Sequence, residues 1–294
     1  MVIAPNSTTP LTSKAHIGLF TGFTPEGHYS EGLAHAVWDL GNPRLTVLAG
    51  RHESLPDHRA VKAAWRPGFP FLSDGLRAIE AHDFDLVHIQ HEFTMFGSGI
   101  SVPQVRRLAQ HVHASGIPLV TTIHAVPSRR SIDRNFVRAF MGTNRIPSAI
   151  VRALIVWTIR GLCLHSTCVI THTHGLGELL TREYGLATNR LVHIPLGVPV
   201  RVPAAQAHSK YDGPLLVCPG YVSRRKGLET VIRAFGKVLV KIPDARLHLV
   251  GGIAHSTYER ELQELAANVG AAEAVIFTGM VPLSQFYDEL RRAQ

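Results

Sequence analysis

The amino-acid sequence predicts an α/β protein made of two doubly wound parallel-sheet domains, the second of them incomplete. Three observations lead to this prediction. Short runs of strand length alternate with helical patterns along almost all of the 294 residues. Most of these runs are apolar on both faces, which is typical of parallel strands covered by helices on both sides. One segment rich in Pro, Ala and polar residues interrupts the alternation at 199–213.

The first domain is expected over residues 15–198, after a flexible polar leader at 1–14 that lacks the apolar core of a signal peptide. A helix is predicted at Tyr29–Leu40, after a loop that contains glycine. The runs predicted as strands share a high content of apolar and β-branched residues: His16–Phe20, Arg44–Ala49, Val61–Trp65, Asp85–Gln90, Pro118–Ile123, Thr167–Thr171 and Arg190–Pro195. This strand–loop–helix order is what a doubly wound domain requires.

The segment 199–213 is predicted to be a linker, and a second domain follows at 214–294. Its strands are predicted at Leu215–Cys218, Arg246–Val250 and Val275–Phe277, and three apolar stripes with helical spacing follow them. A parallel sheet of only three strands has an exposed edge, which natural domains rarely leave uncovered. The sequence therefore predicts that this domain is truncated.

Composition narrows the choice of partners and compartment. Lys and Arg exceed Asp and Glu by 30 − 22 = 8, which favours anionic partners. The positive charge is dispersed and aromatic residues make up 7%, so nucleic acid is not an expected partner. The three cysteines show no paired spacing, which favours a reducing, cytoplasmic compartment. No apolar run reaches the roughly 18–20 residues of a membrane-spanning helix, since Arg152 and Arg160 interrupt the most apolar stretch.

The basic and apolar segment 129–165 allows two interpretations. Ile150, Leu154 and Trp157 share one helical face, and Val151 and Ile155 adjoin it. A buried pair of helices in the first domain is the favoured interpretation. The alternative is peripheral contact with the inner face of a membrane, or with a lipid acceptor.

Unusual polar residues follow the predicted strands, where ligands bind in open α/β sheets. His91 and Glu92 follow one strand, His124 follows the next, and His172 follows a third. An ordinary polar loop is the alternative for each of them. No third and fourth ligand at a characteristic spacing accompanies these histidines, so we expect no metal in the site.

The strongest local motif is the run PGYVSRRKG, which ends at Gly227 between a strand and an amphipathic helix. Its glycines permit close approach of the backbone, and amide groups at the start of the helix attract an anion. Three cations add positive charge: Arg224, Arg225 and Lys226. This combination suits a diphosphate, although the run is neither a Walker A loop nor a G-x-G-x-x-G fingerprint. A solvated basic turn is the alternative.

GYVSRRKG and IPDARLHLVGG together resemble the donor side of GT-B glycosyltransferases of family 4. DLVHIQHEFTMFG, PLVTTIHAVP and THTHGLGELLTREYG…LVHIPLGVP are similar, in order and context, to the first domain of its mannosyl- and glucosyltransferase-like members. The resemblance spans His16 to Gln294. It implies two facing Rossmann-like domains and retaining transfer of a hexose from a GDP- or UDP-linked donor. The acceptor is expected to be a sugar or a lipid-linked sugar.

The resemblance also implies residue roles. Lys226 matches the lysine that contacts the donor diphosphate, and Arg224, Arg225 and Gly220 are expected beside it. Gly22 and Gly27 match the glycine loop that faces the donor phosphates. His124 matches a catalytic cleft histidine, and we expect the acceptor side of the cleft to include His91, Glu92 and His172.

The sequence departs from the family pattern at three places. Gly220 stands where many members carry an arginine, and Leu196 stands where a histidine often occurs. The family also places two glutamates, separated by seven residues, in a region beyond Gln294. Two alternatives therefore remain beside the transferase: a catalytically inactive remnant, and a sugar-nucleotide 2-epimerase of the same architecture.

Overall fold

The computed structural model describes residues 15–22, 29–41, 43–51, 55, 58–93, 95–96, 101–141, 145–197, 213–253 and 256–293. The chain divides into two compact units, Met1–Val198 and Pro199–Gln294. We describe each unit by itself. Gly27, the predicted leader and residues 199–212 of the predicted linker lie outside the described residues.

The first unit contains a parallel sheet of seven strands in the order β3-β2-β1-β4-β5-β6-β7. Their bounds are β1 His16–Phe20, β2 Arg44–Gly50, β3 Val61–Trp65, β4 Leu86–His91, β5 Leu119–Ile123, β6 Cys168–Thr171 and β7 Leu191–His193. The chain builds the sheet outward from β1 in one direction and then, from β4, in the other. The switch between β1 and β4 is where ligands bind in such sheets. The last strand ends at His193, before Pro195, whose nitrogen has no hydrogen for a strand ladder.

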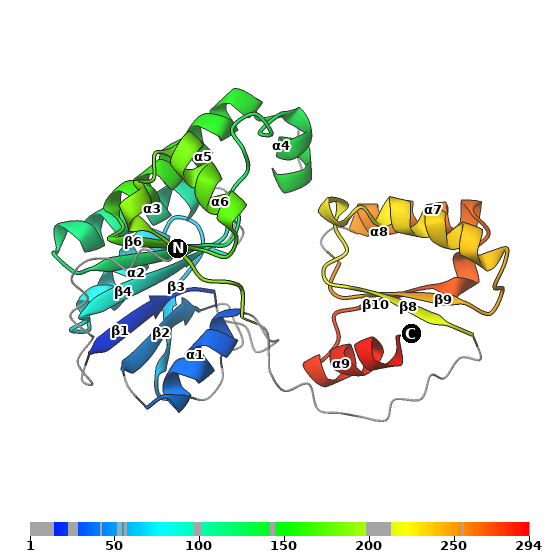
Figure 1. The fold of residues 1–294 in the computed structure, drawn as a ribbon, viewed down its shortest axis with the longest axis horizontal. Helices are drawn as coiled ribbons and strands as arrows, with labels where there is room; N and C mark the ends of the chain where they lie inside the picture. Colours follow the sequence, from blue (N-terminus) through cyan, green and yellow to red (C-terminus); the bar gives the residue numbers. More distant parts are fainter. Residues whose placement is uncertain are drawn as a thin grey trace. The chain divides into compact units, whose positions relative to one another are not determined.

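Six α-helices belong to the described part of this unit: α1 Tyr29–Asp39, α2 Phe71–Glu80, α3 Ser101–Ala114, α4 Arg134–Met141, α5 Ser148–His165 and α6 His174–Leu179. Neighbouring side chains of β1 enter different cores, because successive side chains of a strand point to opposite faces. Leu19 packs with Ala34 of α1, whereas Phe20 packs with Phe71 of α2 and Leu108 of α3. Figure 1 shows α1 on one side of the sheet and α3 and α5 on the other.

Helix α5 packs against α3 and α4, as the favoured interpretation of the segment 129–165 predicts. The buried face is that of Val151 and Ile155, however, whereas Ile150 is 60% exposed and Trp157 is 40% exposed. Because α5 is apolar around most of its circumference, the sequence pattern does not distinguish the two faces. By length and composition, α5 is also the one helix in the described part of the chain that could cross a membrane.

The second unit contains a parallel sheet of three strands in the order β10-β9-β8. The strands are β8 Leu215–Pro219, β9 Arg246–Val250 and β10 Val275–Gly279. Helices α7 Leu228–Leu239 and α8 Ser256–Asn268 lie on one face, and α9 Leu283–Arg292 lies on the other (Figure 1). A buried contact of 2.7 Å between His248 Nδ1 and Glu289 Oε2 ties β9 to α9. The three strands and three helices agree with the elements predicted from the sequence.

Candidate functional site

Four glycines crowd the carboxyl ends of the strands in the second unit. We call Gly220, Gly251, Gly252 and Gly279 the glycine edge. A Cβ atom on Gly251 would lie 2.5 Å from the carbonyl oxygen of Gly220, and the φ of Gly251 is 147°. The strand pairing continues past β8 and β9 through a bond of 2.8 Å from the Gly220 N–H to the Val250 carbonyl. Glycine is therefore required where these two backbones meet.

Lys226 lies directly against this edge. It ends a one-turn 3-10 helix, Arg224–Lys226, and a Cβ atom on Gly220 would lie 3.2 Å from its Nζ atom. Its side chain is exposed, and it forms no ion pair with any carboxylate in the described part of the chain. The structure thus places an available cation over the end of β8.

The start of α7 adds further positive potential beside Lys226. The N-cap residue is Gly227, whose φ is 64°, and no side chain caps the first amide groups of this 12-residue helix. Unpaired amides and the aligned peptide dipoles make such an end attractive to anions. Lys226, the glycine edge and the start of α7 together form a place where a diphosphate can be held.

The other two cations of the motif differ from Lys226. Arg224 Nη2 donates to both carboxylate oxygens of Glu261, at 2.6 and 2.5 Å, and the guanidinium lies 4.6 Å from the centre of the Tyr258 ring. Glu261 raises the pKa of Arg224. Arg224 is therefore committed to α8. The side chain of Arg225 lies outside the described part of the structure.

In the first unit, polar side chains from three neighbouring strands form a connected chain, which we call the histidine chain. Thr122 Oγ1 contacts His88 Nε2 at 2.8 Å, and the Gln90 amide joins His88 at 3.1 Å. The same Gln90 amide contacts His124 Nε2 at 2.7 Å, and His124 Nδ1 contacts His172 Nε2 at 3.2 Å. The chain thus runs across the ends of β4, β5 and β6.

The number of ring protons limits the charge of the His124–His172 pair. His172 Nδ1 faces the carbonyl oxygen of Ile194 at 2.8 Å, so this nitrogen must donate. With Gln90 Oε1 facing it, His124 Nε2 must donate as well, and the contact between the two rings needs a third proton. Two neutral imidazoles carry only two, so this arrangement has a net charge of +1. If the Gln90 amide is rotated by 180°, its nitrogen donates to His124 Nε2 instead. His124 Nδ1 can then donate to His172 Nε2, so two ring protons suffice and the pair is neutral.

Burial favours the neutral form. Burial, with a smaller effect of His172, lowers the pKa of His124 to about 4, and burial lowers the pKa of His88 to about 4. These pKa values favour the orientation in which the Gln90 amide nitrogen donates to His124 Nε2 and the amide oxygen accepts a hydrogen bond from His88 Nε2. The chain fixes the orientation of the His124 ring without adding charge to this edge of the sheet.

The remaining predicted residues occupy different surroundings. His91 is 1% exposed and packs against Phe93 and Phe96; burial lowers its pKa to about 3. Its ring is therefore not open to an acceptor, although its carbonyl accepts from the His124 N–H at 3.0 Å. Glu92 is partly exposed just beyond β4.

Gly22 follows β1, and its carbonyl oxygen accepts from the Thr21 hydroxyl at 2.9 Å. Beyond it, at the start of α1, Tyr29 joins the site, which the sequence did not indicate. Its ring centre lies 5.0 Å from that of His124 and 5.1 Å from that of His172. Burial raises the pKa of Tyr29.

Among the described residues, no group of three His, Cys, Asp or Glu side chains is arranged to hold a metal ion. The acidic pair Asp83 and Asp85 lies at the amino end of β1. There the Asp85 carboxylate accepts from the His16 N–H at 2.7 Å, and the Asp83 carbonyl contacts the His16 ring at 3.1 Å.

Two Rossmann-like parallel-sheet units, each with ligand-type residues at the carboxyl ends of its strands, define a protein of the GT-B glycosyltransferase class. Residues 28–202 match the model of Glycosyltransferase Family 4, and residues 204–294 match that of Glycosyl transferases group 1. The first match covers more than half of the chain, so the chain belongs to glycosyltransferase family 4.

One curated relative is 34% identical to the chain over 104 residues. It is the GDP-mannose-dependent alpha-(1-6)-phosphatidylinositol monomannoside mannosyltransferase of Mycolicibacterium smegmatis. The match spans 32% of this chain and 26% of that enzyme, so the chain aligns with only about a quarter of its relative's length.

Solved structures share the fold at low identity. Sucrose-phosphate synthase from Thermosynechococcus elongatus has a TM-score of 0.66 and 16% identity, over 95% of this chain and 74% of that one. Anabaena HepE in complex with UDP and glucose gives the same TM-score and identity, over 95% of this chain and 72% of that one. These likenesses confirm the predicted fold class.

Proposed function

We propose that the protein transfers a hexose from a nucleotide-sugar donor to an acceptor hydroxyl group. The observation that carries this proposal is the position of Lys226 against the glycine edge, beside the uncapped start of α7. A diphosphate needs several positive partners within a small space, and this place provides a cation and backbone amides together.

In the proposed reaction, the bond between the anomeric carbon and the diphosphate oxygen breaks, and a bond from the acceptor oxygen to that carbon forms. The acceptor proton leaves with the departing diphosphate. Negative charge grows on the diphosphate as the bond breaks, so Lys226 and the amides of α7 stabilise the transition state more than the ground state. These groups are the basis for proposing transfer without a metal. We infer retention of the anomeric configuration from the family resemblance alone.

The first unit is proposed to present the acceptor. His124 and Tyr29 meet at the carboxyl ends of its strands, and the histidine chain holds the His124 ring in one orientation. Both ring nitrogens of His124 have partners in Gln90 and His172, so this neutral ring is proposed to contact the acceptor through its face and its C–H edge, beside the Tyr29 ring. Glu92 is proposed to lie on the acceptor side of this edge, and Gly22 to belong to the loop that faces the donor phosphates, as the family resemblance implies.

The donor is proposed to be GDP- or UDP-linked, and the acceptor to be a sugar or a lipid-linked sugar. The mycobacterial relative is named for GDP-mannose and a phosphatidylinositol mannoside, and HepE for a complex with UDP and glucose. These names support the class of donor and acceptor and leave the choice between them to experiment.

The exposed face of α5 is proposed to touch the inner face of a membrane. Ile150, Trp157 and Leu164, each seven residues from the next, are 60%, 40% and 60% exposed. The segment 129–165 carries seven arginines and one acidic residue, Asp133, so its net charge is 7 − 1 = +6. Apolar side chains among cations favour a surface of anionic lipid. A cytoplasmic protein with such a face could reach a lipid-linked acceptor.

The experiment incubates the full chain with UDP- and GDP-linked glucose and mannose, with methyl α-mannopyranoside or phosphatidylinositol monomannoside as acceptor. The expected result is a glycosylated acceptor whose formation falls in Lys226→Met and persists in Lys237→Met, a matched exposed lysine on α7. An epimerised hexose formed without acceptor would identify the epimerase instead. Absence of both transfer and hydrolysis with every donor would identify the inactive remnant.

A further inference from the structure

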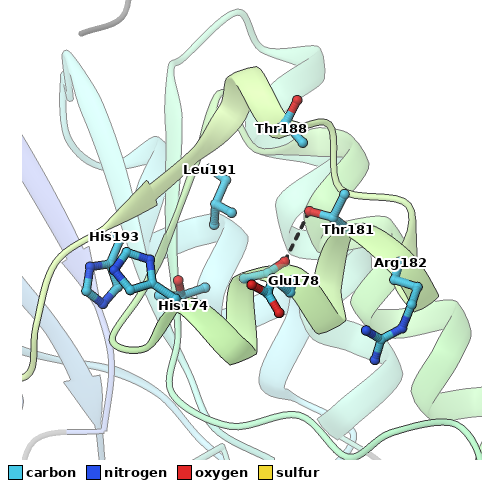
Figure 2. Close-up of a pocket in the computed structure, with 9 residues that line it drawn as sticks. His174, Glu178, Thr181, Arg182, Thr188, Leu191 and His193 are labelled. Carbon is cyan, nitrogen blue, oxygen red and sulfur yellow. Dashed lines mark hydrogen bonds between the residues drawn. The ribbon is translucent and has the colours of Figure 1, made fainter. Parts of the chain in front are cut away.

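A pocket of about 480 Å³ lies between α6 and the edge strand β7, beside the histidine chain. This volume falls within the roughly 300–1,000 Å³ usual for small-molecule sites. Figure 2 shows the imidazoles of His174 and His193 side by side at one end, with Thr188 at the other. The lining residues come from β6, from α6, from the π-helical turn Leu180–Tyr184 that follows it, from the segment that leads into β7 and from β7 itself: Thr171, His174, Gly177, Glu178, Thr181, Arg182, Thr188, Leu191 and His193.

Local packing shapes the pocket. The two imidazoles stack with ring centres 3.9 Å apart and an interplanar angle of 28°. Gly177 allows α6 to pass close to β7, because a Cβ atom there would lie 2.7 Å from Leu191 Cδ2. The Thr181 hydroxyl donates to the Gly177 carbonyl at 3.1 Å and keeps its lone pairs free to accept.

The lining has the chemistry of a carbohydrate site. Glu178 is exposed and has no partner among the described side chains, so its carboxylate can accept from hydroxyl groups. Arg182 can donate, and imidazoles and threonine hydroxyls can do both. Leu191 offers an apolar surface to the C–H groups of a ring. The opposite charges of Glu178 and Arg182 offset each other, so the lining favours an uncharged polar ligand over an anion or a cation.

The pocket is connected to the proposed acceptor edge. His193 Nε2 contacts the carbonyl oxygen of His172 at 3.0 Å, and the His172 ring contacts His124. The histidine end of the pocket therefore lies next to His172 and, through it, near His124. These histidines come from the ends of three adjacent strands.

We propose that this pocket binds a second sugar ring of a carbohydrate acceptor, beyond the ring that carries the accepting hydroxyl group. The inference rests on the proposed function for the identity of the acceptor, but it concerns a different unit from the diphosphate site. It implies that an acceptor of two or more sugar units binds more tightly than a monosaccharide.

The test follows the ring C–H resonances of His174 and His193 by NMR while methyl α-mannopyranoside or α-1,6-mannobiose is added to the full chain. The expected result is a saturable shift with both probes and tighter binding of the disaccharide. Two variants alter the pocket: Glu178→Ala removes the carboxylate, and Thr188→Phe fills the end opposite the histidines. Each should weaken disaccharide binding about fivefold or more, the equivalent of one lost hydrogen bond. Glu264→Ala, on an exposed part of α8, is the matched control and should bind as the parent does.

The absence of a saturable shift, or equal disaccharide binding by the parent and both pocket variants, would overturn the inference. Binding of UDP and GDP is measured in the same samples. If nucleotide binds but the sugars do not, the pocket inference fails and the proposed function stands. If the sugars bind in the pocket but no nucleotide binds, the proposed function fails and the sugar site stands.

Discussion

Lowering the pH from 7 to 5 is expected to destabilise the first unit strongly. His88, His91 and His124 have folded-state pKa values lowered to about 4, 3 and 4, chiefly by burial, from the usual 6.5. Above pH 6.5 these rings are neutral in both states, so they add no dependence on pH. Below pH 6.5 these histidines bind protons in the unfolded chain and stay neutral in the folded unit. The free energy of unfolding therefore falls with pH until the folded-state pKa values are reached.

The size of the effect follows from this linkage. Each histidine that stays neutral only in the folded state lowers the free energy of unfolding by about 1.4 kcal/mol for each pH unit below 6.5. Between pH 6.5 and 5, the buried His88 and His91 together remove about 4 kcal/mol, and His124 adds up to about 2 kcal/mol. A domain is usually stable by about 5–15 kcal/mol, so the loss is a large part of the total.

Urea denaturation at pH 7.5, 6.5, 5.5 and 5.0, followed by tryptophan fluorescence, measures this effect, since the first unit contains all three tryptophans and Trp65 is fully buried. His91→Leu should flatten the pH dependence by about one proton. Ile89→Val, a change at a buried side chain of β4 that does not titrate, should lower stability at every pH and leave the pH dependence unchanged. A free energy of unfolding that is equal at pH 7.5 and 5.0 would refute the reasoning, and so would an unchanged slope in His91→Leu.

Three further outcomes are expected. Gly251→Ala should destabilise the second unit by about 2 kcal/mol or more in thermal unfolding, because the new Cβ atom would clash with Gly220. The control is Gly270→Ala, where φ is 72° and no atom lies within 4 Å of the new Cβ atom. It should lower stability by only about 1 kcal/mol. Ile150→Ser with Trp157→Ser should reduce sedimentation of the protein with anionic vesicles, and equal sedimentation would count against the membrane contact. Arg224→Ala should lower stability by at most about 1 kcal/mol and leave the Kd for a nucleoside diphosphate unchanged, because the guanidinium is paired with Glu261. A marked rise in Kd would show that Arg224 contacts the diphosphate.

The strands could be predicted within one or two residues because most are short runs apolar on both faces. The largest differences are at carboxyl ends, where β7 is two residues shorter and β10 two residues longer than expected. The buried face of α5 could not, because that helix is apolar around most of its circumference. Ile150 and Trp157 have the same spacing and character as the side chains that are buried.

Only part of the candidate site could be predicted from the sequence. Residues directly after strands, such as His124 and His172, could be placed at one edge because parallel strands end together. The part played by Gln90 and Tyr29 depends on which strands and helices are neighbours, and spacing along the chain does not encode this. The pairing of Arg224 with Glu261, 37 residues away, likewise depends on how α8 packs.

Isothermal titration of UDP and GDP into the parent chain, Lys226→Met and Lys237→Met tests the central claim most directly. We expect the parent to bind one of the two nucleotides, Lys226→Met to bind it about tenfold or more weakly, and Lys237→Met to bind it as the parent does. Equal affinity in Lys226→Met and the parent would contradict the assignment of the diphosphate to this edge of the second unit.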